Sequence, residues 1–223
     1  CGEAIVKHPD IKAISFTGST RAGERIASIA APMFKKLSLE LGGKNPNMIF
    51  ADCDYEKMLS TTMHSSFSNQ GQICLCSSRI LVEKTVYEKF KAEFIERVKQ
   101  LNTGDPLEET NKQGAIVSET HFDKVMHCIA TAKEEGGKIL CGGNAITATG
   151  RCENGYFIEP TVIENLGPFC KTNQEEIFGP VVTLQAFETV EQALELSSAS
   201  HYGLAATIWT QDISKANMVA AKV

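Results

Sequence analysis

Short apolar runs alternate along the chain with longer stretches in which apolar residues recur every three or four positions. A run of about four to eight apolar residues bounded by glycine or polar residues favours a buried strand, whereas the longer spacing favours an amphipathic helix. The pattern predicts strands at 13–17, 37–40, 47–50, 79–83, 138–141, 156–163, 181–187 and 204–209. It predicts helices at 20–31, after Asp54, after Thr85, at about 120–135, at 190–199 and after Asp212.

Two of these helices carry start signals. Asp54 precedes the helical stretch at 55–59, and an aspartate at this position can accept a hydrogen bond from a first-turn N–H group. Thr85 is followed three positions later by Glu88, which is the spacing of a capping box. The apolar stripe of that helix then falls four residues apart, at Val86, Phe90, Phe94 and Val98.

The alternation of strands and helices predicts an α/β fold built on parallel sheets with helices on both faces. The first strand–helix–strand unit closes near Gly42 and Gly43. We therefore expect a domain boundary there, with residues 1–42 in one domain and residues 43–223 in the other. The polar, glycine-containing stretch at 144–155 is expected to be a mobile surface loop.

Composition changes this picture mainly by exclusion. The 223 residues are 43% hydrophobic and 22% charged, which is typical of a globular protein that can bury a core. The net charge of -5 argues against a nucleic-acid partner, which requires a basic face. No apolar run approaches the ~18 residues that span a bilayer, and no N-terminal signal pattern is present, so no membrane association is expected. The chain starts at Cys1 and ends in a helix-like stretch, and we interpret it as cut at both ends.

The eight cysteines are scattered and include no pair at zinc-ligand spacing. A chain of this length does not need a disulfide framework. The sequence therefore predicts free thiols in a reducing compartment, the cytoplasm, and no metal site.

Residues 16–23 (Phe-Thr-Gly-Ser-Thr-Arg-Ala-Gly) join the end of a strand to the start of a helix through a glycine turn. Such a turn points backbone N–H groups and a helix N-terminus at an anion, typically a phosphate. The glycine spacing fits a P-loop, but Glu24 stands where the lysine should be, and the segment is not a GxGxxG fingerprint. From these residues alone, an ordinary strand–helix turn with a cap is an equal alternative.

Glu40 ends an apolar run and is followed by Leu41, Gly42 and Gly43. The glycines leave room for the backbone to approach a ligand closely, and a carboxylate at this point could act as a general base. The alternative is a carboxylate at the rim of a strand that has no catalytic role.

Cys74 lies in the polar segment Asn-Gln-Gly-Gln-Ile-Cys at 69–74, between a helix-like and a strand-like stretch. A lone cysteine is often an inert buried thiol. The amides and the glycine around Cys74 instead favour an accessible thiol that could act as a nucleophile. Cys76 borders the next strand, and we interpret it as a packing residue.

The segment at 175–180 (Glu-Glu-Ile-Phe-Gly-Pro) places two acids before an aromatic residue and a glycine–proline turn. Alone, it indicates a loop with a solvated charge pair. His8, His64, His127 and His201 have no partner at the spacing of a metal site or a catalytic triad, so we interpret them as structural.

Taken together and in this order, the segments at 16–20, 40–44, 69–74 and 175–180 closely resemble the NAD(P)-dependent aldehyde dehydrogenase superfamily over essentially the whole chain. The resemblance implies a Rossmann-like parallel-sheet fold, in which the chain is mostly the catalytic domain, preceded by the C-terminal part of the NAD-binding domain. The stretch at 73–79 (Ile-Cys-Leu-Cys-Ser-Ser-Arg) is most similar to the branch that acts on muconic semialdehydes, such as 2-aminomuconic semialdehyde.

This resemblance implies catalytic roles for two residues. Cys74 would be the nucleophile that attacks the aldehyde carbon, and Glu40 would be the base that activates water to hydrolyse the resulting thioester. The resemblance also implies NAD as the cofactor, a small aldehyde as the substrate and a homo-oligomeric parent enzyme.

The resemblance further implies a set of cofactor-binding residues. Gly18 and Ser19 would contact the pyrophosphate, with Gly23 closing the same turn. The main chain at Leu41 would lie near the nicotinamide. Two residues of the segment at 175–180 would contact the nicotinamide ribose or lie beside it: Glu176 and Phe178. Three residues stand where some relatives touch the adenosine ribose: His121, Phe122 and Lys124.

The chain departs from the family pattern by absence. It lacks the upstream asparagine of the oxyanion hole, the first strands of the dinucleotide domain and the strand that builds the oligomer, so we expect the 223 residues alone to be inactive. Two alternatives stay open: a catalytically silent relative kept as a binding or structural protein, and a thiol esterase without a cofactor. The presence of both Cys74 and Glu40 argues against the first, and the lack of a histidine near Cys74 in the sequence argues against the second.

Overall fold

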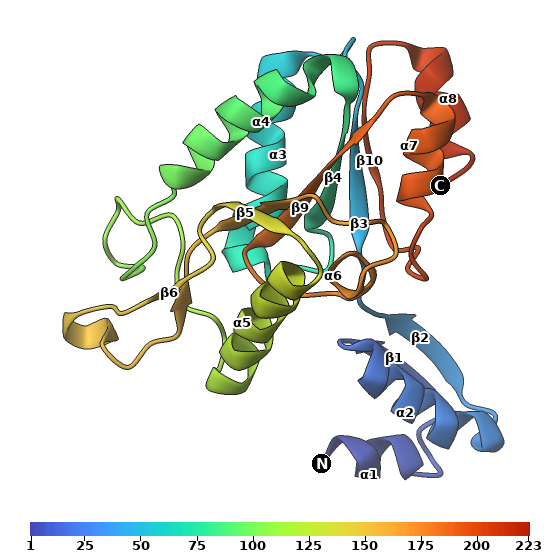
Figure 1. Cartoon of the computed structure of the whole chain (residues 1–223). Helices are drawn as coiled ribbons and strands as arrows, with labels where there is room; N and C mark the ends of the chain where they lie inside the picture. The colour runs from blue at the N-terminus through green and yellow to red at the C-terminus, as the bar shows by residue number, and fades with distance from the viewer. The chain divides into compact units, whose positions relative to one another are not determined.

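The computed structural model describes all residues from 1 to 223 and divides them into two compact units, Cys1–Gly43 and Lys44–Val223 (Figure 1). No helix in the chain is both long enough and apolar enough to cross a lipid bilayer.

The first unit is a strand–helix–strand unit with a short helix before it. Its elements are α1 (Gly2–Lys7), β1 (Ala13–Thr17), α2 (Thr20–Ala30), the 3-10 turn η1 (Ala31–Met33) and β2 (Lys36–Glu40). β1 and β2 pair in parallel, and α2 is the crossover that joins them. Helix α2 ends one residue earlier than predicted, because the chain enters the 3-10 turn that contains Pro32.

The second unit is built on a six-stranded sheet with the strand order β10-β3-β4-β9-β8-β5. The strands of this sheet are β3 (Asn45–Ile49), β4 (Ser77–Glu83), β5 (Lys138–Cys141), β8 (Thr161–Glu164), β9 (Val181–Phe187) and β10 (Thr207–Trp209). Every neighbouring pair is parallel except β5 with β8. The prediction of an α/β fold dominated by parallel strands is confirmed, with one antiparallel edge strand.

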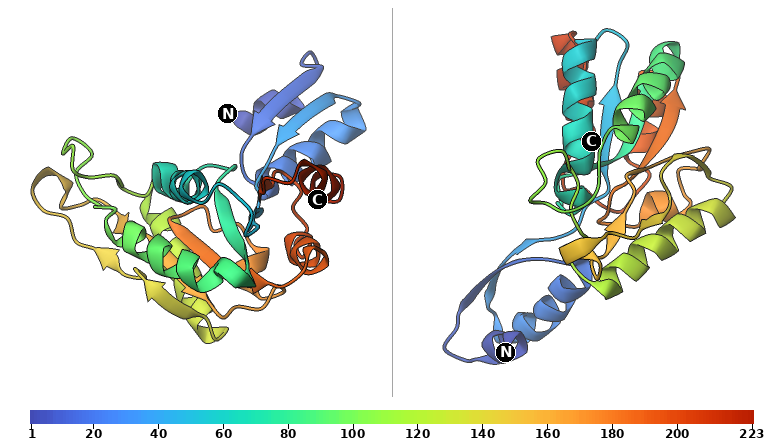
Figure 2. Two further views of the ribbon diagram at one scale, coloured as in Figure 1. Left: turned by 90° about the horizontal axis from the view of Figure 1, so that it is seen from above. Right: turned by 90° about the vertical axis from the view of Figure 1, so that its left-hand side faces the viewer.

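Helices cover both faces of this sheet. The elements between and beside the strands are α3 (Tyr55–Phe67), η2 (Ser68–Gly71), α4 (Lys84–Lys99), α5 (Glu119–Glu134), β6 (Ala145–Ile146), η3 (Gly150–Cys152), β7 (Phe157–Ile158), α6 (Lys171–Gln174), α7 (Val190–Ser197) and α8 (Ile213–Ala220). Figures 1 and 2 show α3 and α4 on one side of the sheet and α7 and α8 on the other.

Strand β4 shows how one sequence serves both faces. Ile80 and Val82 pack in the core under α3 and α4, whereas Leu81 packs in the core under α7 and α8. All three side chains are fully buried. A strand covered on both faces carries a continuous apolar run and not an alternating one, and residues 80–82 form such a run.

Three predicted elements differ in the structure. The single strand at 156–163 is two strands, β7 and β8, separated at Glu159 and Pro160, and proline has no N–H to give to a ladder. The strand at 204–209 is reduced to Thr207–Trp209 and is only half-buried, because it lies at the edge of the sheet. The capping box at Thr85 is wrong: α4 begins at Lys84, and the Thr85 hydroxyl donates to the Glu83 carboxylate instead.

Two predicted helix caps are confirmed. Asp54 caps α3 by accepting from the N–H of Lys57, and Asp212 caps α8 by accepting from the N–H groups of Ser214 and Lys215. The stretch at 144–155 contains β6 and η3, and an ion pair between Arg151 and Asp105 ties it to the loop after α4.

Candidate functional site

Glu40 ends β2, and its main chain is tied to the turn that follows β1. Thr17 lies opposite Glu40 in the parallel pair, and the N–H of Gly18 donates to the Glu40 carbonyl over 3.0 Å. Because the carboxyl ends of parallel strands meet at one edge of a sheet, the glycine turn and the carboxylate share that edge. The Glu40 side chain is exposed there.

Helix α2 begins at the same edge and is capped by Ser19, whose hydroxyl accepts from the N–H of Ala22 over 3.3 Å. Its first turn presents backbone N–H groups and the positive end of the helix dipole, which suit a phosphate. A Cβ atom built on Gly23 would lie 2.6 Å from a methyl carbon of Leu41, so the close packing of α2 against Leu41 requires glycine here. The first unit therefore gathers five of the predicted residues: Gly18, Ser19, Gly23, Glu40 and Leu41.

Cys74 lies in the turn between η2 and β4 and is half-buried. The N–H of Cys76 donates to the Ile73 carbonyl over 3.0 Å, so the turn encloses Cys74. The Cys76 thiol instead points inward: its Sγ lies 3.9 Å from the Ser68 carbonyl oxygen, and burial raises the pKa of Cys76 to about 11. Both cysteines are half-buried, but only the Cys76 thiol is directed at a nearby main-chain carbonyl, that of Ser68.

The backbone before Cys74 is left-handed at three consecutive residues, with φ of 50° at Asn69, 57° at Gln70 and 69° at Gly71. Left-handed non-glycine residues cost on the order of 1–3 kcal/mol each and persist only where their surroundings fix them. Residues 68–76, hereafter the thiol loop, are fixed in this way. A Cβ atom built on Gly71 would lie 2.1 Å from the carbonyl oxygen of Gly179, so the thiol loop touches the segment at 175–180.

The segment at 175–180, hereafter the acidic loop, contains Glu176 and Phe178. Phe178 is also left-handed, with φ of 60°. His121 on α5 holds it: Nε2 lies 2.6 Å from the Phe178 carbonyl oxygen, and the two rings meet edge to face at 5.9 Å. Lys124, one turn further along α5, donates to the Glu176 carbonyl over 2.9 Å. The second unit therefore brings Cys74, Glu176 and Phe178 into adjoining loops.

The three α5 residues noted in the sequence divide between two environments. His121 and Lys124 bind the main chain of the acidic loop. The Phe122 ring packs instead at the second core of the unit, 5.9 Å from Tyr156. Only the first two have polar groups directed at the candidate site.

Two buried cations lie at the amino ends of β3 and β4. The Nζ of Lys44 has no hydrogen-bond partner, and burial, followed by the charge of Arg79, lowers the pKa of Lys44 to about 7. Arg79 donates to the carbonyls of Lys44, Leu196 and Ser197 over 2.7–2.8 Å, and burial lowers its pKa to about 10. Arg79 thereby fastens the start of β4 to the residue before β3 and to the end of α7.

Asn45, the first residue of β3, was not among the residues predicted from the sequence. Its Nδ2 donates to the carbonyls of Cys74 and Cys76, over 2.7 and 3.1 Å. Its side chain is buried at a strand end, where no apolar periodicity marks it. The only signal in the sequence was a polar residue directly after the Glu-Leu-Gly-Gly-Lys segment. That signal does not reveal the hydrogen-bond partner of Asn45, which lies 29 residues away.

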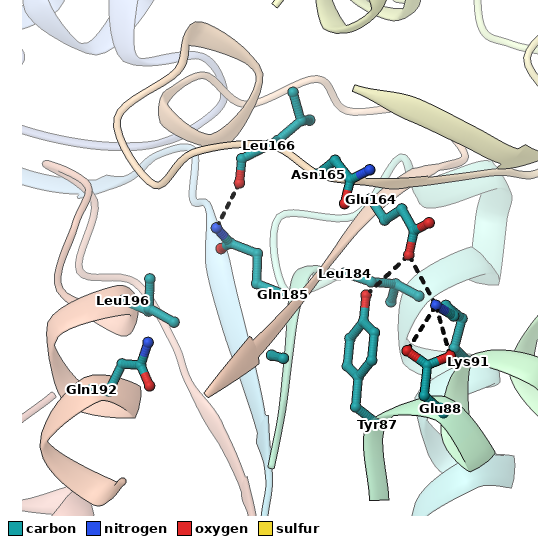
Figure 3. Close-up of a pocket in the computed structure, with 11 residues that line it drawn as sticks. Tyr87, Glu88, Lys91, Glu164, Asn165, Leu166, Leu184, Gln185, Gln192 and Leu196 are labelled. Atoms are coloured by element: carbon teal, nitrogen blue, oxygen red, sulfur yellow. Dashed lines mark hydrogen bonds and ion pairs between the residues drawn. The ribbon is translucent and has the colours of Figure 1, made fainter. Parts of the chain in front are cut away.

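A cavity of about 490 Å³, hereafter the charged cavity, lies between α4, β9 and α7 (Figure 3). Glu164 accepts from the Tyr87 hydroxyl at 3.4 Å and pairs with Lys91 at 3.2 Å. Burial, followed by the charge of Glu164, raises the pKa of Tyr87 to about 12. None of the residues predicted for catalysis or cofactor binding lines this cavity, so its charges do not belong to the candidate site.

Each unit offers distinct chemistry. The second unit holds the half-buried Cys74 thiol in a constrained turn, and a thiolate can form a covalent bond to an electrophilic carbon. The first unit holds an exposed carboxylate that could take a proton from water, beside a helix N-terminus that fits the phosphates of a dinucleotide. Nowhere in the chain do three or more His, Cys, Asp or Glu side chains gather as metal ligands do.

Comparison with known proteins places these features in a family context. The model of the Aldehyde dehydrogenase family matches residues 1–223. The chain is 45% identical over 224 residues to 2-aminomuconic semialdehyde dehydrogenase of Danio rerio, covering 100% of this chain and 46% of that protein. It is 42% identical over 218 residues to 2-aminomuconic 6-semialdehyde dehydrogenase of Pseudomonas sp, covering 98% and 44%.

The structure is similar to a solved betaine aldehyde dehydrogenase of Staphylococcus aureus in complex with NAD+. The TM-score is 0.94 at 38% identity, covering 100% of this chain and 45% of that chain. The chain thus spans about half the length of the relatives that it matches.

Proposed function

We propose that this chain, which belongs to the aldehyde dehydrogenase family, is part of an enzyme that oxidises an aldehyde to a carboxylate with NAD. The observation that carries the proposal is the placement of Cys74: a half-buried thiol held in a strained turn whose glycine packs on the acidic loop. The complex of the Staphylococcus aureus relative with NAD+ supports the choice of cofactor.

In this proposal the cofactor is held by main chain and carboxylate. The N-terminus of α2, with Gly18 and Ser19, would bind the pyrophosphate, and Gly23 would let the helix approach Leu41. Glu176 would bind the nicotinamide ribose, and Phe178 would lie beside it. NAD, when bound, accepts a hydride from the reacting carbon.

Cys74 begins the reaction as the thiolate. Its sulfur forms a bond to the aldehyde carbon, and the carbonyl electrons move to the oxygen to give a thiohemiacetal. Loss of hydride from that carbon leaves a thioester on Cys74. Glu40 then takes a proton from water, the hydroxyl adds to the thioester carbon, and the carboxylate leaves as the Cys74 thiol is restored. A positioned base of this kind contributes about 10²–10⁴-fold to a rate.

The domain roles follow from this assignment. Residues 1–42 would be the C-terminal part of the NAD-binding domain, and residues 43–223 would be the catalytic domain that carries the thiol. We further propose that the full-length enzyme is a cytoplasmic homo-oligomer and that the 223 residues alone are inactive.

The substrate proposed here is a muconic semialdehyde. Two relatives that are 42–45% identical carry the name 2-aminomuconic semialdehyde dehydrogenase or 2-aminomuconic 6-semialdehyde dehydrogenase, which supports this choice over a simple aliphatic aldehyde. A panel of muconic semialdehydes, retinal and aliphatic aldehydes, assayed on the full-length protein, tests it. A higher kcat/KM for an aliphatic aldehyde would contradict the semialdehyde assignment while leaving the reaction type intact.

The reaction type is tested by Cys74→Ser in the full-length protein. We expect NADH formation to be abolished while NAD binding, followed by fluorescence titration, is kept. Retained turnover would overturn the role of Cys74. Aldehyde-independent ester hydrolysis without NADH formation would favour the thiol esterase, and binding without any turnover in the unaltered protein would favour the silent relative.

A further inference from the structure

Asn45 joins the first strand of the second unit to both ends of the Cys74 turn. It opens β3 and pairs with Ser77, the first residue of β4, so it stands where the thiol loop runs into the sheet. Its Nδ2 donates to the carbonyl of Cys74 over 2.7 Å and to the carbonyl of Cys76 over 3.1 Å. One amide nitrogen thus uses both of its hydrogens on the turn that presents the thiol.

The site of this contact is buried. Asn45 is 3% exposed, and its Oδ1 has no hydrogen-bond partner. Leaving a buried carbonyl oxygen unpaired costs about 1–3 kcal/mol, so an asparagine here is not favoured by its own solvation. The Asn45 amide instead supplies hydrogen bonds to two carbonyls of the thiol loop. The same carbonyls fix the orientation of the amide, because a flipped amide would place its Oδ1 against their oxygens.

We infer that Asn45 is a positioning residue for the reaction of Cys74: by holding the carbonyls of Cys74 and Cys76, it sets where the thiol stands relative to the reacting carbon. The inference rests on the proposed role of Cys74 as nucleophile. The inference follows from geometry: Asn69 and Gln70, before the thiol, are in strained left-handed conformations, and the Asn45 amide holds the main chain at Cys74 and just after it.

The same strand supplies a matched control. Asn47 lies two residues along β3, is fully buried, donates from Nδ2 to the Thr62 hydroxyl over 3.0 Å and also has an unpaired Oδ1. It differs from Asn45 in its partner, which is on α3 and not in the thiol loop, and in making one hydrogen bond from Nδ2 where Asn45 makes two. A purely structural role would make alanine at either position act alike.

The test compares Asn45→Ala, Asn45→Asp and Asn47→Ala in the full-length protein. Steady-state assays with an aldehyde and NAD give kcat and KM. Peptide fragmentation follows the second-order rate of Cys74 alkylation by iodoacetamide at several pH values. The melting temperature of each variant is measured as well. We expect Asn45→Ala to lower kcat by about 10–100-fold with KM within a few-fold, because small misplacements of a reacting group are that costly. The pH dependence of the Cys74 alkylation rate in Asn45→Ala should also differ from that of the unaltered protein. Asn47→Ala should lower the melting temperature by a similar amount with kcat and alkylation unchanged.

Asn45→Asp keeps the shape but offers no hydrogen until its carboxyl is protonated. Its kcat and alkylation deficits at neutral pH should match those of Asn45→Ala, and the alkylation deficit relative to the unaltered protein should narrow as pH falls, since a protonated carboxyl regains one donor. Equal losses in the Asn45 and Asn47 variants, or normal kcat and alkylation in both Asn45 variants, would overturn the inference. Turnover that survives Cys74→Ser would instead refute the proposed function itself.

Discussion

The thiol loop and the charged cavity lie in the same unit but are held by opposite means. The thiol loop is fixed by neutral groups: the Asn45 amide, the Gln72 side chain that accepts from the N–H of Val117 over 3.0 Å, and the contact of Gly71 with Gly179. The charged cavity is fixed by ions, with Glu164 between Lys91 and Lys138 at 3.2 and 3.3 Å.

The difference indicates which region is built for chemistry. Dense charge in a hollow is a common guide to an active site. Here the ions of the charged cavity pair with one another, whereas the thiol loop carries backbone strain that neutral contacts sustain. The neutral contacts bind the main chain and side chains of the thiol loop, so they hold the turn that carries Cys74 without a charge pair. The strained neutral loop, and not the charged hollow, is therefore the expected centre of activity.

The largest effect on turnover should come from a substitution that pushes the thiol loop away from the acidic loop. Gly71→Ala would place a methyl group 2.1 Å from the Gly179 carbonyl oxygen at a φ of 69°, so the thiol loop must move. We expect turnover of the full-length protein to fall by about 10²-fold. Gly136→Ala is the matched control, since it has a φ of 88° with nothing within 4 Å; it should cost about 1–2 kcal/mol of stability and leave turnover unchanged. Equal turnover in both variants would show that the contact between Gly71 and Gly179 does not position the thiol loop for the reaction.

The charged cavity should show the reverse pattern. Glu164→Gln removes the charge that Lys91 and Lys138 share, and we expect a loss of about 1.5–3 kcal/mol in the free energy of unfolding, with kcat/KM within twofold. Urea denaturation measures the first quantity and a dehydrogenase assay the second. Glu88→Gln loses only an exposed pair with Lys91 and should cost less than about 1 kcal/mol. A tenfold fall in kcat/KM for Glu164→Gln would contradict the separation of the two regions.

A smaller effect follows from the titration of Glu164. Burial acts to raise its pKa, but hydrogen bonds and charges from Lys91 and Lys138 outweigh burial and leave the pKa below the ordinary value. A carboxyl with a depressed folded-state pKa contributes stability above its unfolded pKa of about 4.3, and that contribution is lost as pH falls through the folded value. The stability difference between the unaltered protein and Glu164→Gln should therefore be constant from pH 8 to about pH 5 and shrink below pH 4. If this stability difference instead grew as pH falls, the pKa of Glu164 in the folded protein would not be depressed.

The two regions also mark what could be predicted from sequence. The centre of β4, which is buried on both faces, was recognisable because Ile80, Leu81 and Val82 are consecutive apolar residues. The direction of the edge strand β5 could not be predicted, because its four residues show no pattern that depends on orientation. Only the pairing of β5 with β8 shows that it is antiparallel. The break at Glu159 and Pro160 was missed because apolar residues stand on both sides of it, at 156–158 and 162–163.

The candidate site divides in the same way. Cys74 and Glu40 were singled out because glycine and polar residues interrupt apolar runs beside them. Asn45 was not, because its role depends on two carbonyls about 30 residues away that no local pattern reveals. The burial of Lys44, which is 2% exposed, was not predicted either, because nothing in the residues beside it marks it as buried.

The most direct test of the central claim is a search for acylated Cys74 during turnover. Full-length protein with Glu40→Gln is mixed with an aldehyde and NAD, quenched in acid and digested, and the peptide that contains Cys74 and Cys76 is fragmented. Because the variant lacks the base proposed to activate water, the account predicts that the acyl mass accumulates on Cys74 and not on Cys76, with about one NADH formed per site. NADH formation without an acyl group on Cys74, or an acyl group on another cysteine, would contradict it.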